Sequence, residues 1–409
     1  MPKAPDIQIV RSRQEFGALE DDWSRLAEAA GADVYLSFDW FYAVLRLAQD
    51  APEHLYIITV RSDGELVGVL PGAIVERKLR VFTHRSLELI GNIYSPLRGC
   101  LVKPEHKNNV AGALVDFLLH ARPNDWAILN FEGLSEGDPS MAEIARLLRE
   151  AGIGARSIPQ FRNVVTDLSG FADSAAYFKS LSKNLRQTIR TGINRMNHEG
   201  DLDAALILNK DQDIDGSMDD YYAIYSESWK RKERDPEFHH RLAGYLATKD
   251  RLRLFLLYFK KTEEGETGAE RQHRVPSYDF LVQPGRGAPA DYRPVAACYF
   301  IVHGKTAYYL KTAFREEHRK HSVGNVLFWF ATKYLLDVDG VTLIDHQKGD
   351  EPYKLRWGEV RETRVQYLAA NPRSAKARLE LWAEHQVVPK LRRVRNWLRR
   401  RRTSPQEQD

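Results

Sequence analysis

The sequence predicts an α/β protein with a mixed sheet, built from two similar units in tandem. Its 409 residues are too many for one ordinary hydrophobic core. Patterns typical of strand, turn, strand, helix and strand occur in that order in the first half of the chain and again at residues 294–357. No sequence identity is apparent between the two halves, so the predicted repeat is one of architecture.

In the first half, apolar residues at helical and at alternating spacing predict the elements of one unit. Ser37 is the expected N-cap of the second helix. We expect helices at residues 15–30, 38–47, 108–120 and 140–151, and strands at 55–60, 66–75, 80–90, 127–132 and 163–168.

The second half follows a joint of small residues, Ser169–Ser174. Residues 260–293 are rich in Gly, Pro, Glu and Arg and exceed an ordinary hairpin connection, so we expect a mobile insertion there. Outside the stretch 294–357, the expected elements are helices at 175–200, 219–232 and 376–385 and strands at 251–258 and 363–369.

An antiparallel hairpin is predicted at the start of the stretch 294–357. Val295–Val302 and Thr306–Lys311 are apolar and β-branched runs separated by a tight turn. A basic loop at 313–321 then leads into a helix at 326–336. The first backbone N–H groups of a helix are unpaired and attract negative charge, so this helix start predicts an anion site.

A buried-type strand, Val341–Ile344, follows this helix and delivers Asp345. Directly beyond it lies a dense cluster of ionisable and hydroxyl side chains that ends at Lys354. The sequence therefore places a candidate reaction site beside the candidate anion site.

Two motifs in this stretch resemble a known family. Arg319-x-x-Ser322-x-Gly324 is similar to the R/Q-x-x-G-x-G/A phosphate loop of GNAT-type N-acyltransferases, with Ser322 in place of the first glycine. The segment GDEPYKLRW at 349–357, with Leu185-Arg186 upstream, resembles the CelD/BcsL type of acetyltransferase. That type is associated with cellulose biosynthesis, has a BioF2-like acetyltransferase domain and is related to FemAB-like double-GNAT proteins. The resemblance covers residues 57–367 and implies acetyl-CoA or another acyl-CoA as co-substrate.

This resemblance implies a FemAB-like architecture of three parts. We expect an N-terminal GNAT-like unit without a cofactor loop at residues 1–170 and a C-terminal GNAT acyltransferase unit at 171–372. A helix and a basic tail at 373–409 complete the chain. Because the second unit alone has the Arg319 loop before a helix, we expect it to bind the acyl-CoA.

An acyl-CoA transferase needs hydrogen-bond donors for the pyrophosphate and a polar contact for the thioester. Backbone N–H groups at the helix start supply the donors, and Arg319 adds a cation. The resemblance implies that the edge of the strand at 306–311 contacts the thioester. The predicted cofactor-binding residues are Lys311, Arg319, Ser322, Val323, Gly324 and Asn325.

The attacking amine also needs an acceptor for its proton. A carboxylate in a closed cleft can have a pKa raised toward neutrality, as such a base requires. We rank Asp345 first as the base or the ammonium anchor, Glu351 second, and Tyr353 as the acid toward the leaving thiolate. In the structural alternative, Asp345 caps the following turn and Glu351 pairs with Lys354. His346 and Asp350 are further candidates.

Substrate contacts are predicted on the helix at 175–200. Lys183, Arg186, Arg190 and Asn194 share one polar face, which is either a solvated surface or a clamp for an anionic ligand. Trp229 is either a core residue or a ligand platform. The predicted substrate-binding residues are Lys183, Arg186, Arg190, Trp229, Lys348 and Lys354.

Other chemistries lack their motifs. The chain has no G-x-S-x-G elbow, Walker loop, H-E-x-x-H or C-x-x-C pair. The adjacent His239 and His240 would diverge on a helix, so we expect an exposed loop pair and no metal site. Cys100 and Cys298 lie in apolar contexts and are expected to be buried thiols.

The charge pattern separates the body of the chain from its C-terminal tail. Lys390–Arg402 contains eight basic residues and no acidic ones, while the whole chain has a net charge of +4. The rest of the chain is therefore net acidic, which argues against a nucleic-acid partner. The tail is a candidate for contact with an anionic membrane surface or an acidic partner. The N-terminal residues lack the apolar core of a secretory signal, so we expect a cytoplasmic protein that can lie at the inner face of a membrane.

Three functions follow as expectations. The first is an acyl-CoA N-acyltransferase that acetylates an amino group of a sugar, a polysaccharide precursor or an amino-acid-like metabolite. The second is a FemAB-like aminoacyl transferase, which would require a larger basic surface. The third is a non-catalytic accessory protein of a polysaccharide machine.

Overall fold

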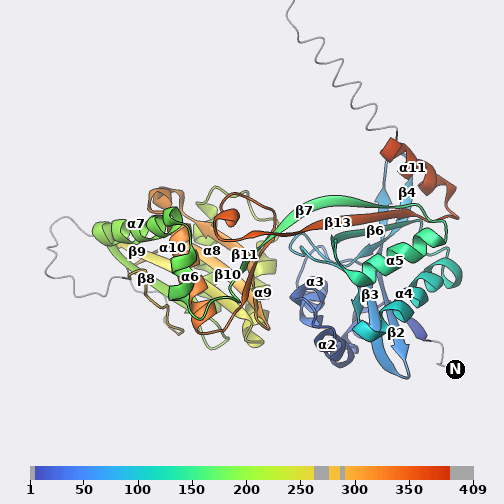
Figure 1. Ribbon diagram of the computed structural model, residues 1–409, viewed down its shortest axis with the longest axis horizontal. Coiled ribbons are helices and arrows are strands. Elements are labelled where there is room, and N and C mark those ends of the chain that lie inside the picture. The colour runs from blue at the N-terminus through green and yellow to red at the C-terminus, as the bar shows by residue number, and fades with distance from the viewer. Residues whose placement is uncertain (1–4, 262–275, 286–290, 387–409) are drawn as a thin grey trace, which may run out of the picture. The chain divides into compact units, whose positions relative to one another are not determined.

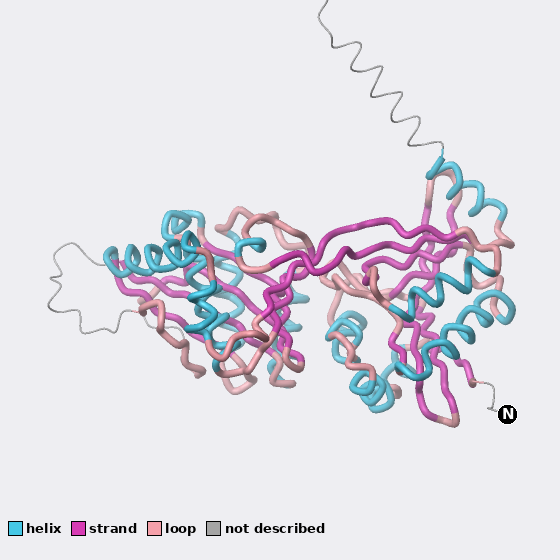
Figure 2. Tube along the Cα trace, in the orientation of Figure 1, coloured by secondary structure: helices cyan, strands magenta, loops and turns pink. Residues whose placement is uncertain are grey.

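The computed structural model describes residues 5–261, 276–285 and 291–386 (Figures 1 and 2). Contacts divide the chain into two compact units. Unit 1 comprises Met1–Leu45, Asp50–Gln160 and Thr363–Asp409. Unit 2 comprises Arg46–Gln49 and Phe161–Glu362.

Unit 1 is a mixed sheet with helices packed against it. Its strands follow the order β1-β2-β3-β4-β6-β13, and the short β5 pairs with β3. The strands are β1 (Asp6–Val10), β2 (Leu55–Ser62), β3 (Glu65–Lys78), β4 (Thr83–Leu89), β5 (Leu101–Val102), β6 (Ile128–Ser135) and β13 (Glu359–Ala370). The helices are α1 (Arg13–Gly17), α2 (Glu20–Ala29), α3 (Phe38–Arg46), α4 (Lys107–Asp116), α5 (Pro139–Glu150) and α11 (Ala375–Gln386).

The strands of unit 2 follow the order β7-β12-β11-β10-β9-β8. Its strands are β7 (Ala155–Asp167), β8 (Gly200–Ile207), β9 (Leu252–Lys261), β10 (Arg293–His303), β11 (Thr306–Phe314) and β12 (Leu343–Lys348). Its helices are α6 (Ser174–Ser180), α7 (Lys183–Glu199), α8 (Ile214–Ser226), α9 (Pro236–Thr248) and α10 (Val323–Asp337), with short 3-10 turns η4 (Glu316–His321) and η5 (Lys354–Arg356).

Both units contain the same succession of elements, which confirms the predicted tandem α/β architecture. In unit 1, the antiparallel pair β3–β4 is followed by α4 and then by β6, which runs parallel to β4. In unit 2, the antiparallel pair β10–β11 is followed by α10 and then by β12, which runs parallel to β11.

The two units exchange their closing strands. The chain leaves unit 1 along β7, whose C-terminal residues pair antiparallel with β12 of unit 2. It returns along β13, which pairs antiparallel with β6 of unit 1. The contacts therefore divide the chain at residues 160 and 362, and not at the expected residues 170 and 372.

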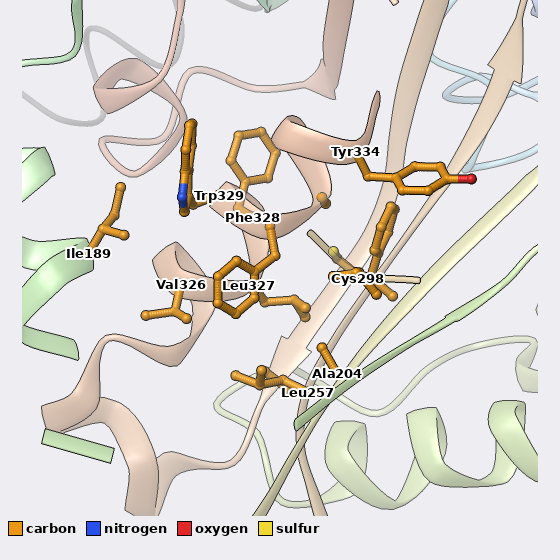
Figure 3. Close-up of a cluster of buried hydrophobic side chains, with 14 of the residues drawn as sticks. Ile189, Ala204, Leu257, Cys298, Val326, Leu327, Phe328, Trp329 and Tyr334 are labelled. Carbon is orange, nitrogen blue, oxygen red and sulfur yellow. The ribbon is translucent and has the colours of Figure 1, made fainter. Parts of the chain in front are cut away.

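The core of unit 2 surrounds α10, which is apolar on nearly all sides because it is packed between the sheet and other helices (Figure 3). Leu327 and Phe328 lie over the strands, and Ile189 of α7 belongs to the same cluster. The opposite face of the sheet is covered by α8, whose Tyr221 meets Tyr299 of β10 edge-on. Both cysteines, Cys100 and Cys298, are confirmed as buried free thiols.

Several local predictions need correction. The helix expected at 175–200 is two helices, because Ser182 caps a new start by accepting a hydrogen bond from the Leu185 N–H. The pair His239-His240 is not an exposed loop but part of α9, and His239 is fully buried. In the expected mobile insertion, the described residues 276–285 are packed in place, with Val282 in the core of unit 2. Residues 262–275 and 286–290 lie outside the described chain, as does the basic tail.

Candidate active site

A gap opens in unit 2 where two parallel strands separate. β11 and β12 pair only from Thr306–Leu343 to Tyr308–Asp345. β11 then continues to Phe314, while β12 remains paired with β7 on its other side. The register between β10 and β11 also shifts here, which leaves Leu310 as an extra residue in a β-bulge. Polar backbone groups of β11 that would face β12 are therefore available to a ligand.

A cavity of about 390 Å³ fills this gap. Strand β11 supplies one wall, the first turns of α10 a second, and β12 with the loop beyond it a third. The lining residues are Trp229, Tyr309, Thr312, Phe314, Arg319, Ser322, Gly324, Asn325, Phe328, His346, Tyr353, Arg356 and Trp357.

The N-terminus of α10 opens on this cavity without a side-chain cap. Ser322 has left-handed backbone angles (φ 54°, ψ 35°), and its hydroxyl group makes no capping hydrogen bond. The carbonyl group of Ser322 accepts the first hydrogen bonds of the helix, from the N–H groups of Asn325 and Val326. The N–H groups of Val323 and Gly324, which come before them, have no partner among the described residues. By contrast, α6, α7, α8 and α9 are each capped by a side chain, from Asp173, Ser182, Asp213 and Asp235. The start of α10 therefore has the donors and the dipole of an anion site.

Gly324 allows close approach to this helix start. A Cβ atom at Gly324 would lie 3.2 Å from the ring of Phe314, which is tighter than an ordinary contact. Phe314 in turn packs on Trp229, with 4.4 Å between ring centroids. Trp229 is 47% exposed and lines the cavity, so it is not a core residue.

His346 lines the cavity and has one buried ring nitrogen without a hydrogen-bond partner among the described residues. Its Nε2 lies 2.8 Å from Thr166 Oγ1, and this hydroxyl group lies 3.0 Å from the carbonyl oxygen of Trp357. A carbonyl oxygen only accepts, so Thr166 donates its one proton to Trp357 and accepts from the Nε2–H of His346. Nδ1 of His346 is then the unprotonated nitrogen, and it has no partner among the described residues.

Burial and a nearby cation keep His346 neutral. Desolvation and, to a lesser extent, the ammonium group of Lys354 together lower the pKa of His346 to about 3. The ring therefore offers a lone pair at any pH near neutrality, but it is a weak base.

Asp345 points away from the cavity, because neighbouring residues of a strand face opposite sides. Its carboxylate accepts hydrogen bonds from Asn163 Nδ2 (2.8 Å) and from the backbone N–H of Gln347 (2.6 Å). Gln347 has positive φ (66°), so these bonds hold a strained turn. Asp345 is also within β12 and not at its end.

The loop after β12 is closed by a buried lysine. Lys354 Nζ donates to the carbonyl oxygen of Lys348 (2.5 Å) and lies 2.9 Å from the carboxylate of Glu351. Neither Lys354 nor Glu351 lines the cavity. Tyr353 does line it, and partial desolvation together with Glu351 raises the pKa of its phenol, which stays protonated.

The charges that line the cavity are positive. Arg319 is paired with Glu316 at 2.7 Å, and Arg356 has no ion-pair partner among the described residues. None of the described residues that line the cavity is a carboxylate. In the described part of the chain, no group of three or more His, Cys, Asp or Glu side chains could hold a metal ion.

A polar groove of about 510 Å³ adjoins this cavity and shares Ser322 and Arg356 with it. One wall is a face of α7, which approaches η4 so closely that a Cβ atom at Gly192 would lie 2.3 Å from the carbonyl oxygen of His321. The groove is lined by Ser182, Asn184, Leu185, Gln187, Thr188, Thr191, Gly192, Arg195, Lys320, Ser322 and Arg356.

The remaining predicted contacts lie elsewhere. Arg186 donates to the carbonyl oxygen of Lys179, and Arg190 stacks over Phe178 and Tyr278, so the basic face of α7 turns away from the groove. Lys183 and Lys348 are exposed and line neither the cavity nor the groove. Lys311 forms a buried ion pair with Glu233 at 2.6 Å.

Of the predicted cofactor residues, Arg319, Ser322, Gly324 and Asn325 line the cavity, and Val323 contributes its N–H at the helix start.

Comparison with known proteins points to the same part of the chain. Residues 288–355 match the family described as "Acetyltransferase (GNAT) domain". No curated protein matches the chain. Among solved structures, a crystal structure of FemX is similar over 85% of this chain and 95% of that chain, at 13% identity and a TM-score of 0.57. This likeness shows a shared fold.

Two further solved structures are similar at lower TM-scores. A tandem GNAT protein from the clavulanic acid biosynthesis pathway covers 90% of this chain and 100% of its own, at 16% identity and a TM-score of 0.48. The L-PGS structure from Bacillus licheniformis covers 90% of this chain and 95% of its own, at 13% identity and a TM-score of 0.49.

Proposed function

We propose that the chain is an acyl-CoA-dependent N-acyltransferase whose active site is the cavity between β11 and β12. The observation on which this proposal rests most is the uncapped start of α10, which faces the gap where the two strands separate. The match of residues 288–355 to an acetyltransferase domain supports the same class of reaction.

The residues of the two cavities fit an acyl-CoA. The free N–H groups of Val323 and Gly324, with Arg319 and Arg356, would hold its pyrophosphate. The apolar gap beside β11 would hold the acyl-bearing arm, and the polar groove would hold the phosphorylated nucleoside end. Acyl-CoA supplies an activated acyl thioester.

The charge of the cavity selects the form of the acceptor. With Arg319 and Arg356 in the lining and Lys354 buried close by, a positive ammonium group is disfavoured. The acceptor amine would therefore bind in its neutral form, which is also the nucleophilic form. Amino groups of sugars, polysaccharide precursors or amino-acid-like metabolites are the proposed acceptors, and those with an additional negative group fit best.

His346 would orient this neutral amine. Its Nδ1 lone pair accepts a hydrogen bond from the amine N–H and thereby directs the nitrogen lone pair toward the acyl group. A nitrogen with a pKa near 3 is poorly suited to remove a proton from an ammonium ion, so its contribution is one of positioning. The protonated phenol of Tyr353 can donate a hydrogen bond to a leaving thiolate.

Calorimetry on the full chain tests the cofactor assignment. We expect saturable binding of both acetyl-CoA and CoA, because the phosphates supply most contacts. Release of free thiol from acetyl-CoA, measured with glucosamine and with L-lysine as probe amines, then tests turnover. Binding without thiol release from any amine in a panel would favour the accessory-protein alternative, and absence of binding would remove the assignment.

A further inference from the structure

Unit 1 has a groove of about 830 Å³ beside its last helix, α11, lined by apolar side chains and two arginines. The groove runs between α11, the end of β13 and the start of β7. It is lined by Gly152, Ile153, Gly154, Ala155, Arg156, Leu368, Ala370, Pro372, Ala375, Arg378, Leu379, Leu381 and Trp382. Among the described residues of this lining, Arg156 and Arg378 are the charged ones and none is a carboxylate.

Helix α11 carries large apolar side chains on its outer side as well as on its inner side. Ala377 and Leu381 are buried against unit 1, as expected for a packed helix. Leu379 and Trp382, three residues apart on the outer side, are 60% and 58% exposed. Large exposed apolar side chains that cluster in this way mark an interaction surface.

This surface is held rigidly. Glu380, buried on the inner side of α11, accepts hydrogen bonds from the backbone N–H groups of Val81 (2.7 Å) and Phe82 (3.1 Å) and contacts His84 Nε2 at 2.7 Å. These bonds fix α11 to the turn between β3 and β4. Val81 on that turn is 71% exposed, so it extends the apolar surface.

Cations border the apolar residues. Arg156 and Arg378 line the groove, and neither has an ion-pair partner among the residues that the structure describes. Lys376, in the first turn of α11, has its Nζ 5.1 Å from the centroid of the Phe82 ring. The chain continues beyond α11 into Lys390–Arg402, with eight basic residues and no acidic ones. The positive charge of the tail thus begins four residues after the helix that presents Leu379 and Trp382.

We infer that this face of unit 1 docks on an anionic phospholipid surface. Trp382 and Leu379 enter the headgroup region, where a tryptophan ring is favoured. Arg156 and Arg378 contact lipid phosphates at the edge of the apolar groove. A second copy of this chain is a poorer occupant, because a symmetric contact would bring the same unpaired arginines together.

Vesicle sedimentation with the full-length chain tests this inference. We expect the chain to pellet with phosphatidylglycerol-containing vesicles, not with pure phosphatidylcholine vesicles, and to be released by 1 M NaCl, which screens the charges. The double variant Leu379→Ser/Trp382→Ser should lose at least tenfold in partition coefficient. The partition coefficient of the double variant Arg156→Gln/Arg378→Gln should fall about fivefold for each cation removed.

A matched control removes exposed apolar surface elsewhere. Ile93 and Val338 are each 52% exposed and neither lines the groove, so Ile93→Ser/Val338→Ser should bind as the parent does. All variants change exposed side chains, and circular dichroism verifies that they are folded. Unchanged binding of Leu379→Ser/Trp382→Ser would overturn the inference, because the tail alone would then explain the attachment. Failure of the parent to bind anionic vesicles, or self-association that the Leu379→Ser/Trp382→Ser change abolishes, would also overturn it.

Discussion

His346 and Asp345 are neighbours on β12, yet the strand presents them to opposite sides. His346 lines the cavity and has a buried nitrogen without a partner among the described residues, whereas Asp345 holds the turn at Gln347 and accepts a hydrogen bond from Asn163. A single strand position thus separates the residue that can touch a substrate from the residue that supports the loop. The proposed function assigns the substrate contact to His346, although the sequence ranks Asp345 first.

Paired substitutions distinguish these two roles. His346→Phe retains the shape of the aromatic pocket, and Thr166 still donates to the Trp357 carbonyl group, so we expect a folded protein with kcat/KM at least tenfold lower. Asp345→Asn should cost about 1 kcal/mol of stability, because a neutral amide oxygen accepts the bonds from Asn163 and Gln347 less strongly than a carboxylate does, and should change kcat less than threefold. Steady-state kinetics measure the kinetic constants of the two variants, and urea unfolding measures their stability. A large loss of kcat in Asp345→Asn alone would return the catalytic role to the carboxylate.

The depressed pKa of His346 predicts acid-sensitive stability. As the pH falls below 6.5, the unfolded chain protonates this histidine, while the folded chain does so only near pH 3. The unfolded state therefore binds more protons in this window, and stability falls with falling pH. Between pH 7 and pH 5 the parent should lose about 2 kcal/mol more than His346→Phe, as measured by urea unfolding. Equal losses in the two proteins would contradict the buried neutral state of His346.

At the scale of elements, α10 and α7 show what sequence patterns can and cannot reveal. The loop with Arg319 and Gly324 predicts the anion-binding helix start from the sequence alone, because that site depends on backbone groups next to each other in the chain. The sequence pattern does not indicate the face of α7 that lines the polar groove. It consists of Asn184, Thr188, Thr191 and Arg195, whose spacing matches one helical face but whose side chains are mostly uncharged. The more conspicuous basic face is occupied by local contacts.

A glycine pair tests the helix start of α10. Gly324→Ala places a methyl group beside Phe314 at the site proposed for phosphates, so we expect acetyl-CoA affinity to fall at least tenfold. Gly244→Ala is the matched control, because Gly244 also lies in a helix of unit 2 and a Cβ atom there meets nothing within 4 Å. Calorimetry should show parental affinity for Gly244→Ala. Equal affinities for the two variants would remove the phosphates from the start of α10.

For the whole molecule, the tandem architecture was predictable, but the division into units was not. Local periodicity identifies strands and helices and their repeated order, and both halves follow it. Strand exchange leaves no such local signal, since β7 and β13 are ordinary strands by pattern. Their partners, β12 and β6, are distant in sequence, and only tertiary pairing assigns the C-terminal part of β7 to unit 2 and the C-terminal part of β13 to unit 1.

Hydrogen–deuterium exchange of the full chain, with and without saturating acetyl-CoA, tests most directly whether unit 2 is the acyl-CoA-binding unit. The amides most affected should lie along β11 beyond Tyr308, in the first turn of α10 and in residues 346–357, because these segments line the cavity. We predict slower exchange in all three segments and no change in β2, β3 or β4 of unit 1. Protection confined to unit 1, or none in unit 2 at a concentration that calorimetry shows to be saturating, would contradict the proposed active site.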